Sequence, residues 1–332
     1  MLAEIRADLA RPQPMARLVQ GDVGSGKTVV ALASLLTAIE AGCQGALMAP
    51  TEVLAEQHYR KLAEWLPQLH VTSALLTGST PAPRRRQLLQ DLVNGQLQLL
   101  VGTHALLEDP VQFDRLGLVV VDEQHRFGVR QRNRLLAKGL QPHLLTMTAT
   151  PIPRTLAMTY YADLEVSVID ELPPGRKPVV TKLIKENRRP EVVVGVQQEL
   201  AKGRQCYWVC PLIEESEVLQ LKTALETFET LSNILSEYSV GLIHGKLKAE
   251  EKSSIMARFK DAQIQLLVST TVIEVGVDVP NATLMVIEHA QRFGYAQIHQ
   301  LRGRVGRGAE QSVCILLYSD ALSTAAKERL QT

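Results

Sequence analysis

The stretch Gly21–Thr28 reads GDVGSGKT and decides the fold class of this 332-residue chain. It fits the pattern G-x-x-x-x-G-K-[ST], whose glycines let backbone N–H groups turn inward around a phosphate. The short strand predicted at Arg17–Gln20 precedes the loop, and the apolar helix predicted at Val29–Glu40 directs its positive N-terminal end at the anion. Lys27 is placed to reach the β- and γ-phosphates, and Thr28 to ligate Mg²⁺. The residues expected to bind the nucleotide here are Gly21, Gly24, Ser25, Gly26, Lys27 and Thr28.

Composition describes an ordinary soluble globular chain, with 45% hydrophobic and 21% charged residues. Its length favours two domains, and a net charge of only +1 means that any nucleic-acid binding must come from a local patch. The four cysteines are scattered without metal-ligand spacing, which predicts reduced thiols in the core. No apolar run reaches the length of a membrane span and the N-terminus lacks a secretory pattern, so we expect a cytoplasmic protein.

Short apolar runs alternate with helical stretches in both halves of the chain. In the first half they are Gly45–Ala49, Val71–Leu76, Leu97–Val101, Leu118–Val121 and His143–Met147, and in the second Val179–Ile184, Gln205–Cys210, Val240–Ile243, Ile264–Ser269, Leu284–Ile287 and Val313–Tyr318. Continuous apolar strands separated by helices predict mainly parallel sheets with helices on both faces, which bind ligands at the carboxyl ends of their strands. The segment Asp170–Pro178 (DELPPGRKP) interrupts this alternation, which predicts domains at 1–172 and 173–332.

Two adjacent carboxylates, Asp122 and Glu123, follow the apolar strand LGLVVV. A carboxylate at a strand end can hold Mg²⁺ through water, and its neighbour can accept a proton from an attacking water molecule. We assign these roles to Asp122 and Glu123 respectively. An exposed acidic turn is the alternative, which the phosphate loop upstream makes less favoured.

The second half has no phosphate loop of its own, but it contains the basic stretch Gln300–Arg307, QLRGRVGR. Guanidinium groups are planar, permanently charged and bidentate towards phosphate, so Arg304 and Arg307 suit a γ-phosphate. An arginine finger contributes about 10³–10⁵-fold in rate, and delivery from a second domain would make hydrolysis depend on domain closure. The alternative is a basic loop that binds any anion or is simply solvated.

The phosphate loop, DEQH, TAT and QxxGRxGR occur in the order that resembles superfamily 2 helicases. Those proteins are P-loop NTPases that fold as two tandem RecA-like domains. Each domain is a mainly parallel sheet flanked by helices, and ATP lies in the cleft between the domains. Longer passages resemble the RecG branch-migration helicases: VVVDEQHRFGVRQR, TMTATPIPRTLAMT, IDELPPGR, YWVCPLIEESE, TTVIEVGVDVPNA and HQLRGRVGRG. The transcription-repair coupling translocases share three of the motifs but usually lack DELPPGR and CPLIEESE, so the RecG resemblance is the closer one.

This resemblance implies roles for residues at the matching positions. Lys27, Asp122, Glu123, Gln300, Arg304 and Arg307 would act in ATP hydrolysis, with Thr28 and Asp122 on the metal and with Gly276 and Asp278 near the ribose. The DNA-backbone contacts would be Pro50, Thr51, Thr77, Gly78, Thr103, His104, His244, Gly245 and Thr270. His125, Thr148 and Thr150 would couple the nucleotide state to these contacts. Taken singly, each threonine would more simply be a cap at a strand end.

The resemblance implies a DNA-dependent ATPase and ATP-dependent 3′-to-5′ DNA helicase that requires ATP and Mg²⁺. Its substrate would be branched or forked DNA, remodelled by fork regression and Holliday-junction branch migration in recombination and repair. We expect a monomer in the bacterial cytoplasm. Two alternatives stay open, a duplex-DNA translocase of the transcription-repair coupling type and a nucleotide-gated DNA-binding module with little turnover.

The chain also departs from full RecG proteins. It has no counterpart of their N-terminal wedge domain, of the segment before the phosphate loop that recognises adenine, or of the C-terminal hairpin. We therefore expect it to be a motor core from a longer protein. Of its basic stretches, we interpret Arg84–Arg86 as a solvated helix face, and Arg126–Lys138 fits either a solvated face or a site residue cluster.

Overall fold

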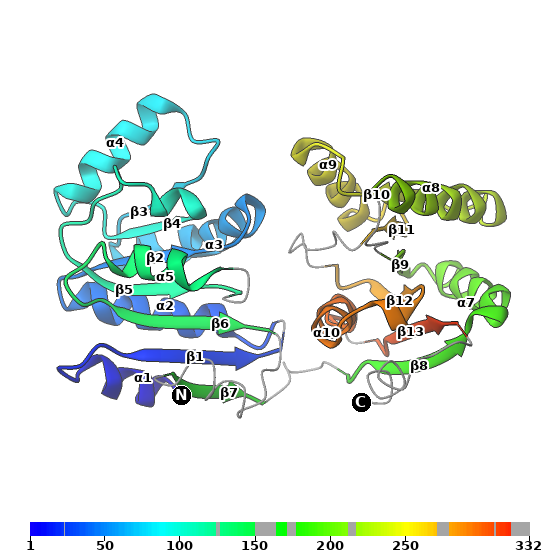
Figure 1. Cartoon of the computed structure of the whole chain (residues 1–332), viewed down its shortest axis with the longest axis horizontal. Coiled ribbons are helices and arrows are strands. Elements are labelled where there is room, and N and C mark those ends of the chain that lie inside the picture. The colour runs from blue at the N-terminus through cyan, green and yellow to red at the C-terminus, as the bar shows by residue number, and fades with distance from the viewer. Residues whose placement is uncertain are drawn as a thin grey trace. The chain divides into compact units, whose positions relative to one another are not determined.

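The computed structural model describes residues 1–22, 24–123, 127–149, 164–170, 177–211, 217–270, 279–308 and 310–319. The chain divides into two compact units, Met1–Glu171 (unit 1) and Leu172–Thr332 (unit 2), coloured blue to green and green to red in Figure 1. The boundary expected between residues 172 and 173 falls in a segment, 171–176, outside the described residues. Each unit is a parallel sheet flanked by helices, so the predicted α/β class is confirmed.

Unit 1 is built on seven described strands in the order β3-β4-β2-β5-β6-β1-β7, with every neighbouring pair parallel. The strands are β1 (Ala16–Gly21), β2 (Gln44–Met48), β3 (Ser73–Leu76), β4 (Leu99–Gly102), β5 (Leu116–Val121), β6 (His143–Thr148) and β7 (Glu165–Ile169). The helices are α1 (Leu2–Leu9), α2 (Lys27–Glu40), α3 (Glu52–Trp65), α4 (Ala82–Val93) and α5 (Val129–Leu136), with short 3₁₀ turns η1 (Leu66–Leu69) and η2 (His104–Leu107). The edge strand β7 is an element that the sequence analysis did not anticipate.

The sheet of unit 1 separates two hydrophobic cores. Successive residues of β5 alternate between them, with Leu118 and Val120 in one core and Val119 and Val121 in the other. Helices α1, α2 and α3 supply the first core, and α4, η2 and α5 supply the second. Burial on both faces is the reason why these strands read as continuous apolar runs, since neither face needs polar residues.

A buried ion pair holds β1, the strand that leads into the phosphate loop. The guanidinium of Arg17 donates through Nε to Asp8 Oδ2 at 2.8 Å and through a terminal nitrogen to Ser167 Oγ at 2.6 Å. Asp8 comes from α1 and Ser167 from β7, and Asp8 and Arg17 are both buried. This cluster therefore ties α1, β1 and the edge strand β7 together.

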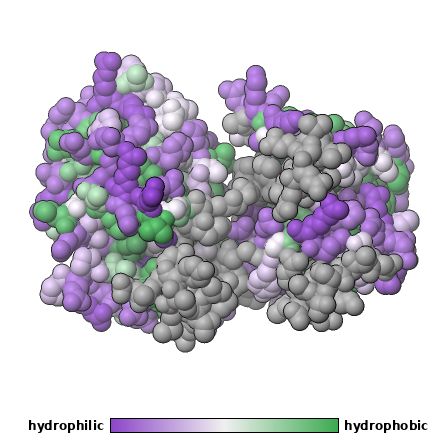
Figure 2. All heavy atoms as spheres, in the orientation of Figure 1, coloured by the Kyte–Doolittle hydropathy of each residue, from purple (hydrophilic) through white to green (hydrophobic). Residues whose placement is uncertain are grey.

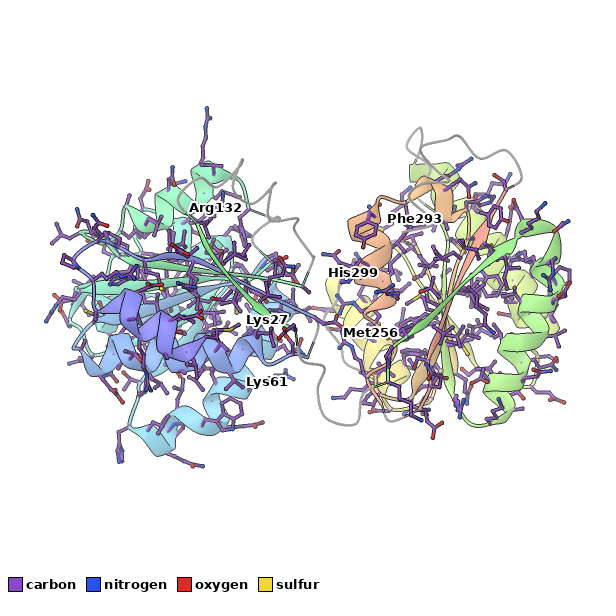
Figure 3. The ribbon with its side chains drawn as sticks, turned by 90° about the horizontal axis from the view of Figure 1, so that it is seen from below. Lys27, Lys61, Arg132, Met256, Phe293 and His299 are labelled. Carbon is purple, nitrogen blue, oxygen red and sulfur yellow. The ribbon has the colours of Figure 1, made fainter. Side chains whose placement is uncertain are left out.

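Unit 2 repeats the architecture with six described strands in the order β10-β11-β9-β12-β13-β8, again all parallel. The strands are β8 (Val180–Lys185), β9 (Gln205–Val209), β10 (Val240–Ile243), β11 (Leu266–Ser269), β12 (Ala282–Ile287) and β13 (Val313–Tyr318). The helices are α7 (Arg189–Ala201), α8 (Glu217–Ile234), α9 (Ala249–Lys260) and α10 (Tyr295–Arg302), with turns η4 (Glu186–Arg188) and η5 (Ala290–Arg292). One core includes Met256 and Phe293, labelled in Figure 3, and the other lies under α7 and α8.

A pair of buried glutamines shows how closely the two units correspond. Gln44 opens β2, and its amide nitrogen donates to the carbonyls of Leu92 and Leu97. Gln205 opens β9, the strand at the same position of its sheet, and donates in the same way to the carbonyls of Phe259 and Ile264. Each glutamine satisfies the carbonyls of a helix end and the following loop, so the two units use one solution to begin the same strand.

The visible face in Figure 2 is largely hydrophilic where it belongs to described residues, with smaller hydrophobic patches between. Leu140 and Val129 are among the exposed large hydrophobic side chains. None of the helices in the described ranges combines the length and the apolar character needed to cross a membrane.

Candidate nucleotide and nucleic-acid sites

The phosphate loop connects β1 directly to α2. Gly24 and Gly26 have φ angles of 82° and 97°, in the left-handed region that favours glycine, and Gly26 is the N-cap of α2. The ammonium nitrogen of Lys27, labelled in Figure 3, donates to the carbonyl oxygens of Gly21 at 2.6 Å and Asp22 at 2.7 Å. The lysine is thus folded back over its own loop, at the N-terminal end of α2.

Two features of this loop fit an anion. The hydroxyl oxygen of Ser25 is buried and has no hydrogen-bond partner among the residues that the structure describes. A Cβ on Gly21 would lie 2.5 Å from that oxygen and 3.0 Å from the Cβ of Ile169, so only glycine leaves the hydroxyl its place. An unsatisfied buried donor beside a helix N-terminus is what a bound phosphate would complete.

Asp122 follows β5 immediately and is buried, with 8% of its surface exposed. His58 Nε2 lies 2.7 Å from Oδ2 of Asp122, and the backbone N–H of Glu123 donates to Oδ1 at 3.0 Å. Burial alone would raise the pKa of Asp122, but the hydrogen bond and charge of His58, the charge of Lys27 and the N–H of Glu123 lower it, and the net shift is downward. The carboxyl is therefore held ionised.

Glu123 adopts a φ of 47°, an uncommon conformation for a residue with a side chain, at the turn that ends β5. Its side chain is partly buried beside Asp122. Strained backbone of this kind costs on the order of 1–3 kcal/mol and concentrates at functional sites. The finding agrees with an assigned role for Glu123 at this turn, because the alternative of a freely solvated acidic turn would not require the strain.

The possible oxygen ligands at this edge suit Mg²⁺ better than a metal ion that protein side chains enclose completely. Within the described parts of the chain, no three His, Cys, Asp or Glu side chains gather closely enough to hold a metal ion. Mg²⁺ is ordinarily held by one or two carboxylates together with substrate phosphates and water. Ionised Asp122 and the hydroxyl of Thr28, on the first turn of α2, are donors of the right kind.

The sequence-predicted residues of unit 1 divide along the carboxyl edge of its sheet. The nucleotide candidates follow β1 and β5, and Thr148 ends β6 in register with Gln20 of β1. The DNA candidates Pro50–Thr51, Thr77–Gly78 and Thr103–His104 follow β2, β3 and β4. Because the sheet order is β3-β4-β2-β5-β6-β1, the two sets occupy adjacent halves of one edge, with the division between β2 and β5.

The residues of unit 1 that are predicted to contact DNA differ in how exposed they are. Gly78 and His104 are exposed, whereas Thr77 and Thr103 are buried. Thr51 caps α3 by accepting the N–H of Leu54 at 3.3 Å, so its structural role is that of a helix N-cap. Gly78 and His104 are therefore more accessible to DNA than the other candidates at these strand ends.

Residue Glu52 also belongs to this region, although the sequence analysis did not name it. It begins α3, and its carboxylate accepts the backbone N–H and the hydroxyl of Ser79, each at 3.2 Å. The loop after β3 is thereby attached to the start of α3.

In unit 2 the DNA candidates follow the same strand positions as in unit 1. His244 and Gly245 follow β10, and Thr270 follows β11, where its N–H donates to Ile243. Partial burial and the charges of Lys252 and Lys246 lower the pKa of His244, so the imidazole is neutral at pH 7. Its Nδ1 is buried without a hydrogen-bond partner among the described residues.

The arginine candidates lie elsewhere on unit 2. Gln300 is on α10, Arg304 and Arg307 follow this helix, and Arg307 Nε donates to the carbonyl of Gly303 at 3.1 Å. A Cβ on Gly308 would lie 2.7 Å from the carbonyl oxygen of Pro280, just before β12 begins. This loop is therefore at the amino edge of its sheet, opposite His244 and Thr270. The expectation that ligands meet carboxyl ends thus does not describe the arginine loop.

Four further candidates, His125, Thr150, Gly276 and Asp278, lie outside the described residues. Arg84 and Arg86 are exposed on α4, as the solvated interpretation requires, but Arg85 between them is partly buried and pairs with Glu108. In the other basic stretch Arg132 is buried, labelled in Figure 3, and Lys138 donates to the carbonyls of Glu108 and Val111. Part of that stretch is therefore structural.

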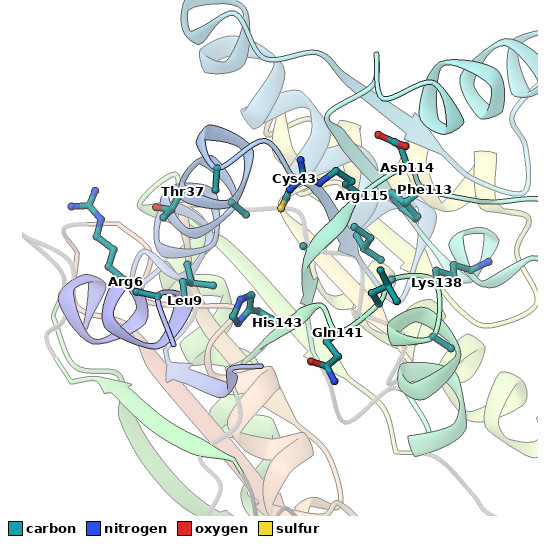
Figure 4. A pocket seen from close by; sticks show the side chains of 18 residues that line it. Arg6, Leu9, Thr37, Cys43, Phe113, Asp114, Arg115, Lys138, Gln141 and His143 are labelled. Atoms are coloured by element: carbon teal, nitrogen blue, oxygen red, sulfur yellow. The ribbon is translucent and has the colours of Figure 1, made fainter. Parts of the chain in front are cut away.

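A pocket of about 840 Å³ opens at the other edge of unit 1 (Figure 4). It is lined by the starts of strands and the end of α2, including Cys43, Arg115 and His143. None of the predicted site residues lines it. The pocket is therefore separate from the predicted nucleotide and DNA sites of unit 1.

Besides Glu52, sequence reasoning missed His58, the partner of Asp122. It lies on the buried stripe of α3 with Ala55 and Leu62, at helical spacing. A titratable side chain on an otherwise apolar stripe was the available signal, but its partner Asp122 is 64 residues away in the sequence.

Comparison with known proteins finds relatives that cover both units. Residues 8–159 match the DEAD/DEAH box helicase family and residues 189–309 match the helicase conserved C-terminal domain. The chain is 58% identical over its whole length to the ATP-dependent DNA helicase RecG of Acidithiobacillus ferridurans and 55% identical to that of Escherichia coli K12. In each case the match covers 48% of the relative, so the chain spans about half the length of these curated relatives.

Solved structures give the same result. A structure of RecG bound to a three-way DNA junction matches 99% of this chain and 43% of that one, with 47% identity and a TM-score of 0.81. Saccharomyces cerevisiae Dbp5 bound to RNA and ADP BeF3 matches 99% of this chain and 86% of its own, with a TM-score of 0.72. At 19% identity the second likeness concerns the fold alone.

Proposed function

Because this chain belongs to the RecG-type helicases of superfamily 2, with two RecA-like domains, we propose that it is an ATP-dependent motor that remodels branched DNA. The observation that carries the proposal is the carboxyl edge of unit 1, where an anion-binding loop and an ionised Asp122 lie beside three strand ends suited to a DNA backbone. We assign nucleotide binding to residues 1–172 and the arginine-bearing domain to residues 173–332. Fork regression and branch migration in repair and recombination are the reactions proposed, by analogy with the RecG relatives.

The residues of unit 1 have distinct tasks in this proposal. Bound Mg²⁺ would neutralise charge on the β- and γ-phosphates. Lys27 exchanges the carbonyls of Gly21 and Asp22 for phosphate oxygens, and Ser25 gains the acceptor that it lacks. Thr28 and Asp122 hold the metal, and Glu123 accepts the proton of the attacking water. These groups belong to the turns after β1 and β5 and to the first turn of α2, which a rigid parallel sheet positions.

Unit 2 supplies the charges that make hydrolysis depend on both domains. Arg304 and Arg307, with Gln300, are proposed to reach the γ-phosphate when the domains close, and Gly276 and Asp278 to approach the ribose. The placement of the arginine loop at one edge and of His244, Gly245 and Thr270 at the other supports separate contacts with nucleotide and DNA. His125, Thr148 and Thr150 are proposed to couple the two.

Contacts to the DNA backbone carry no sequence information, which suits a protein that must move along a strand. The proposed contacts are the strand-end groups of Pro50, Thr51, Thr77, Gly78, Thr103 and His104 in unit 1 and those of His244, Gly245 and Thr270 in unit 2. Closing on ATP and reopening after hydrolysis would shift the grip of one domain along the strand, with 3′-to-5′ polarity. We also propose a bacterial cytoplasmic protein that acts as a monomer, on the basis of its bacterial relatives.

The deciding experiment measures ATP hydrolysis with and without forked DNA at fixed salt and Mg²⁺. A DNA-dependent increase that is lost in Lys27→Ala supports the motor. Nucleotide binding without turnover would instead identify a nucleotide-gated DNA-binding module. Strand displacement on a fork compared with removal of a bound protein from duplex DNA then separates the RecG-like activity from a transcription-repair coupling translocase.

A further inference from the structure

The bond between His58 and Asp122 crosses from the DNA half of the carboxyl edge to the nucleotide half. His58 is on α3, which follows β2, and Asp122 follows β5, the next strand in the sheet. His58 Nε2 and Asp122 Oδ2 are 2.7 Å apart, and 9% of His58 and 8% of Asp122 are exposed. An ionised carboxylate only accepts hydrogen bonds, so the imidazole donates through its Nε2–H. Only a small part of either side chain is open to water that could replace this donor.

The first turn of the same helix is attached to the DNA candidates. Thr51 caps α3, and Glu52 accepts two hydrogen bonds from Ser79 in the loop that contains Thr77 and Gly78. His58 follows Glu52 by six residues, about 9 Å along the helix. The same rigid element therefore carries, within two turns, contacts to two predicted DNA loops and to the predicted metal carboxylate.

We propose that His58 is a positioning residue through which α3 transmits the occupation of the DNA-binding loops to the carboxylate of Asp122. A DNA strand bound to the loops at 50–51 and 77–79 biases the position of the first turn of α3. Because the imidazole is buried and its bond is short, Asp122 follows any shift of the helix. This inference rests on the proposed function, and it adds a route for DNA stimulation that lies within one domain.

The proposal makes a geometric demand that two substitutions can separate. The amide nitrogen of a glutamine is as many bonds from Cβ as His Nε2, whereas that of an asparagine corresponds to Nδ1 and falls short of Asp122. His58→Gln can therefore keep the donor, and His58→Asn removes it at similar polarity and smaller volume. If His58 served packing alone, the position of the amide nitrogen would not make His58→Gln behave better than His58→Asn.

Three measurements apply to the complete chain: the ratio of ATP hydrolysis with and without forked DNA, the Mg²⁺-dependent affinity for a fluorescent ADP analogue, and the thermal midpoint. For His58→Asn we expect both the DNA stimulation and the affinity gained from Mg²⁺ to fall about tenfold, the lower range for lost partners of a metal ligand. For His58→Gln both should stay within about threefold of wild type, on the same scale.

His143→Asn is the matched control for loss of an imidazole in unit 1. His143 accepts the N–H of Met15 at 2.9 Å at the start of β6, far along the sheet from Asp122, so hydrolysis and Mg²⁺-dependent binding should be unchanged. Glu52→Gln tests the other end of α3. It should weaken the response to DNA while leaving the Mg²⁺-dependent nucleotide affinity within about twofold of wild type, since it does not touch Asp122.

Two results would overturn the inference: His58→Asn behaving as wild type, or His58→Asn and His58→Gln losing equal amounts. Failure of the proposed function looks different, because the wild-type chain would then not hydrolyse ATP, its hydrolysis would ignore DNA, or Lys27→Ala would match wild type. Even in that case the ADP measurements decide whether His58 positions Asp122. Should His58→Asn lower the thermal midpoint strongly, Glu52→Gln and His58→Gln still decide the link.

Discussion

The ammonium nitrogen of Lys27 lies 2.6 Å from the carbonyl oxygen of Gly21, the residue that ends β1. Carbonyl oxygens are weak substitutes for phosphate oxygens, which carry full charge and form shorter, stronger hydrogen bonds with an ammonium group. The side chain is therefore held inside the loop by contacts that a triphosphate can readily replace. The arrangement keeps Lys27 close to the position proposed for its contact with the phosphates.

We predict that Lys27→Ala abolishes hydrolysis, because the variant loses the charge that the β- and γ-phosphates require. Steady-state ATPase assays with saturating DNA measure the effect. Lys61→Ala is the control, since Lys61 is an exposed lysine on α3 and should leave the rate unchanged. Hydrolysis by Lys27→Ala near the wild-type rate would show that the phosphate site has been misassigned.

For Arg307→Ala we expect nucleotide affinity close to wild type and hydrolysis lower by at least about a hundredfold, as for loss of an arginine finger. Equilibrium binding of a fluorescent nucleotide and single-turnover hydrolysis separate the two effects. Arg258→Ala removes an exposed arginine at the end of α9 and serves as the control. An unchanged single-turnover rate would remove the interdomain part of the mechanism.

Asp8→Ala should destabilise unit 1 by about 3 kcal/mol, because it leaves buried Arg17 without its main counter-ion. Glu4, 3.5 Å from Arg17, is too distant to replace it fully. Urea unfolding followed by circular dichroism gives the change. Glu40→Ala, at an exposed carboxylate that ends α2, should shift stability by no more than about 0.5 kcal/mol. Equal effects of the two substitutions would contradict the assigned importance of the Arg17 pair.

Thiol labelling of the native protein at pH 8 should modify Cys43 first. Burial raises the pKa of Cys210 and Cys314 to about 12 and raises that of Cys206 further, so these thiols remain protonated well above pH 8. Cys43 is only partly buried, in the pocket of Figure 4. Cys43→Ser should remove the fast phase of labelling with an aromatic disulfide reagent. A fast phase that survives this substitution would mean that a core cysteine is accessible.

The strands could be predicted because burial on both faces leaves a local trace. Val119 and Val120 point to opposite cores, so the run LGLVVV is apolar without interruption. Strand β7 lacks that trace, since Ser167 is its buried residue and Val168 is 46% exposed. An edge strand half open to solvent reads like the connecting segment around it.

The candidate site was predictable where its residues lie together in one loop of the sequence, as in the phosphate loop. The contact between His58 and Asp122 joins separate elements and depends on sheet order, which no local pattern records. The hydroxyl of Thr51 was interpreted in two ways, and its bond to Leu54 N–H adds the capping role. The position of Arg307 at the amino edge of its sheet likewise follows from the short α10 and the packing of Gly306 and Gly308, not from the motif.

Each unit buries its own pair of cores about its own sheet, and this has a consequence for protein engineering. Among the described residues each hydrophobic core lies within one unit, so the two halves are candidates for production as separate polypeptides. Cutting the connection would turn a tethered encounter into a bimolecular one and make turnover rise with the concentration of the added half. A split enzyme of this kind would report directly how much the covalent link contributes.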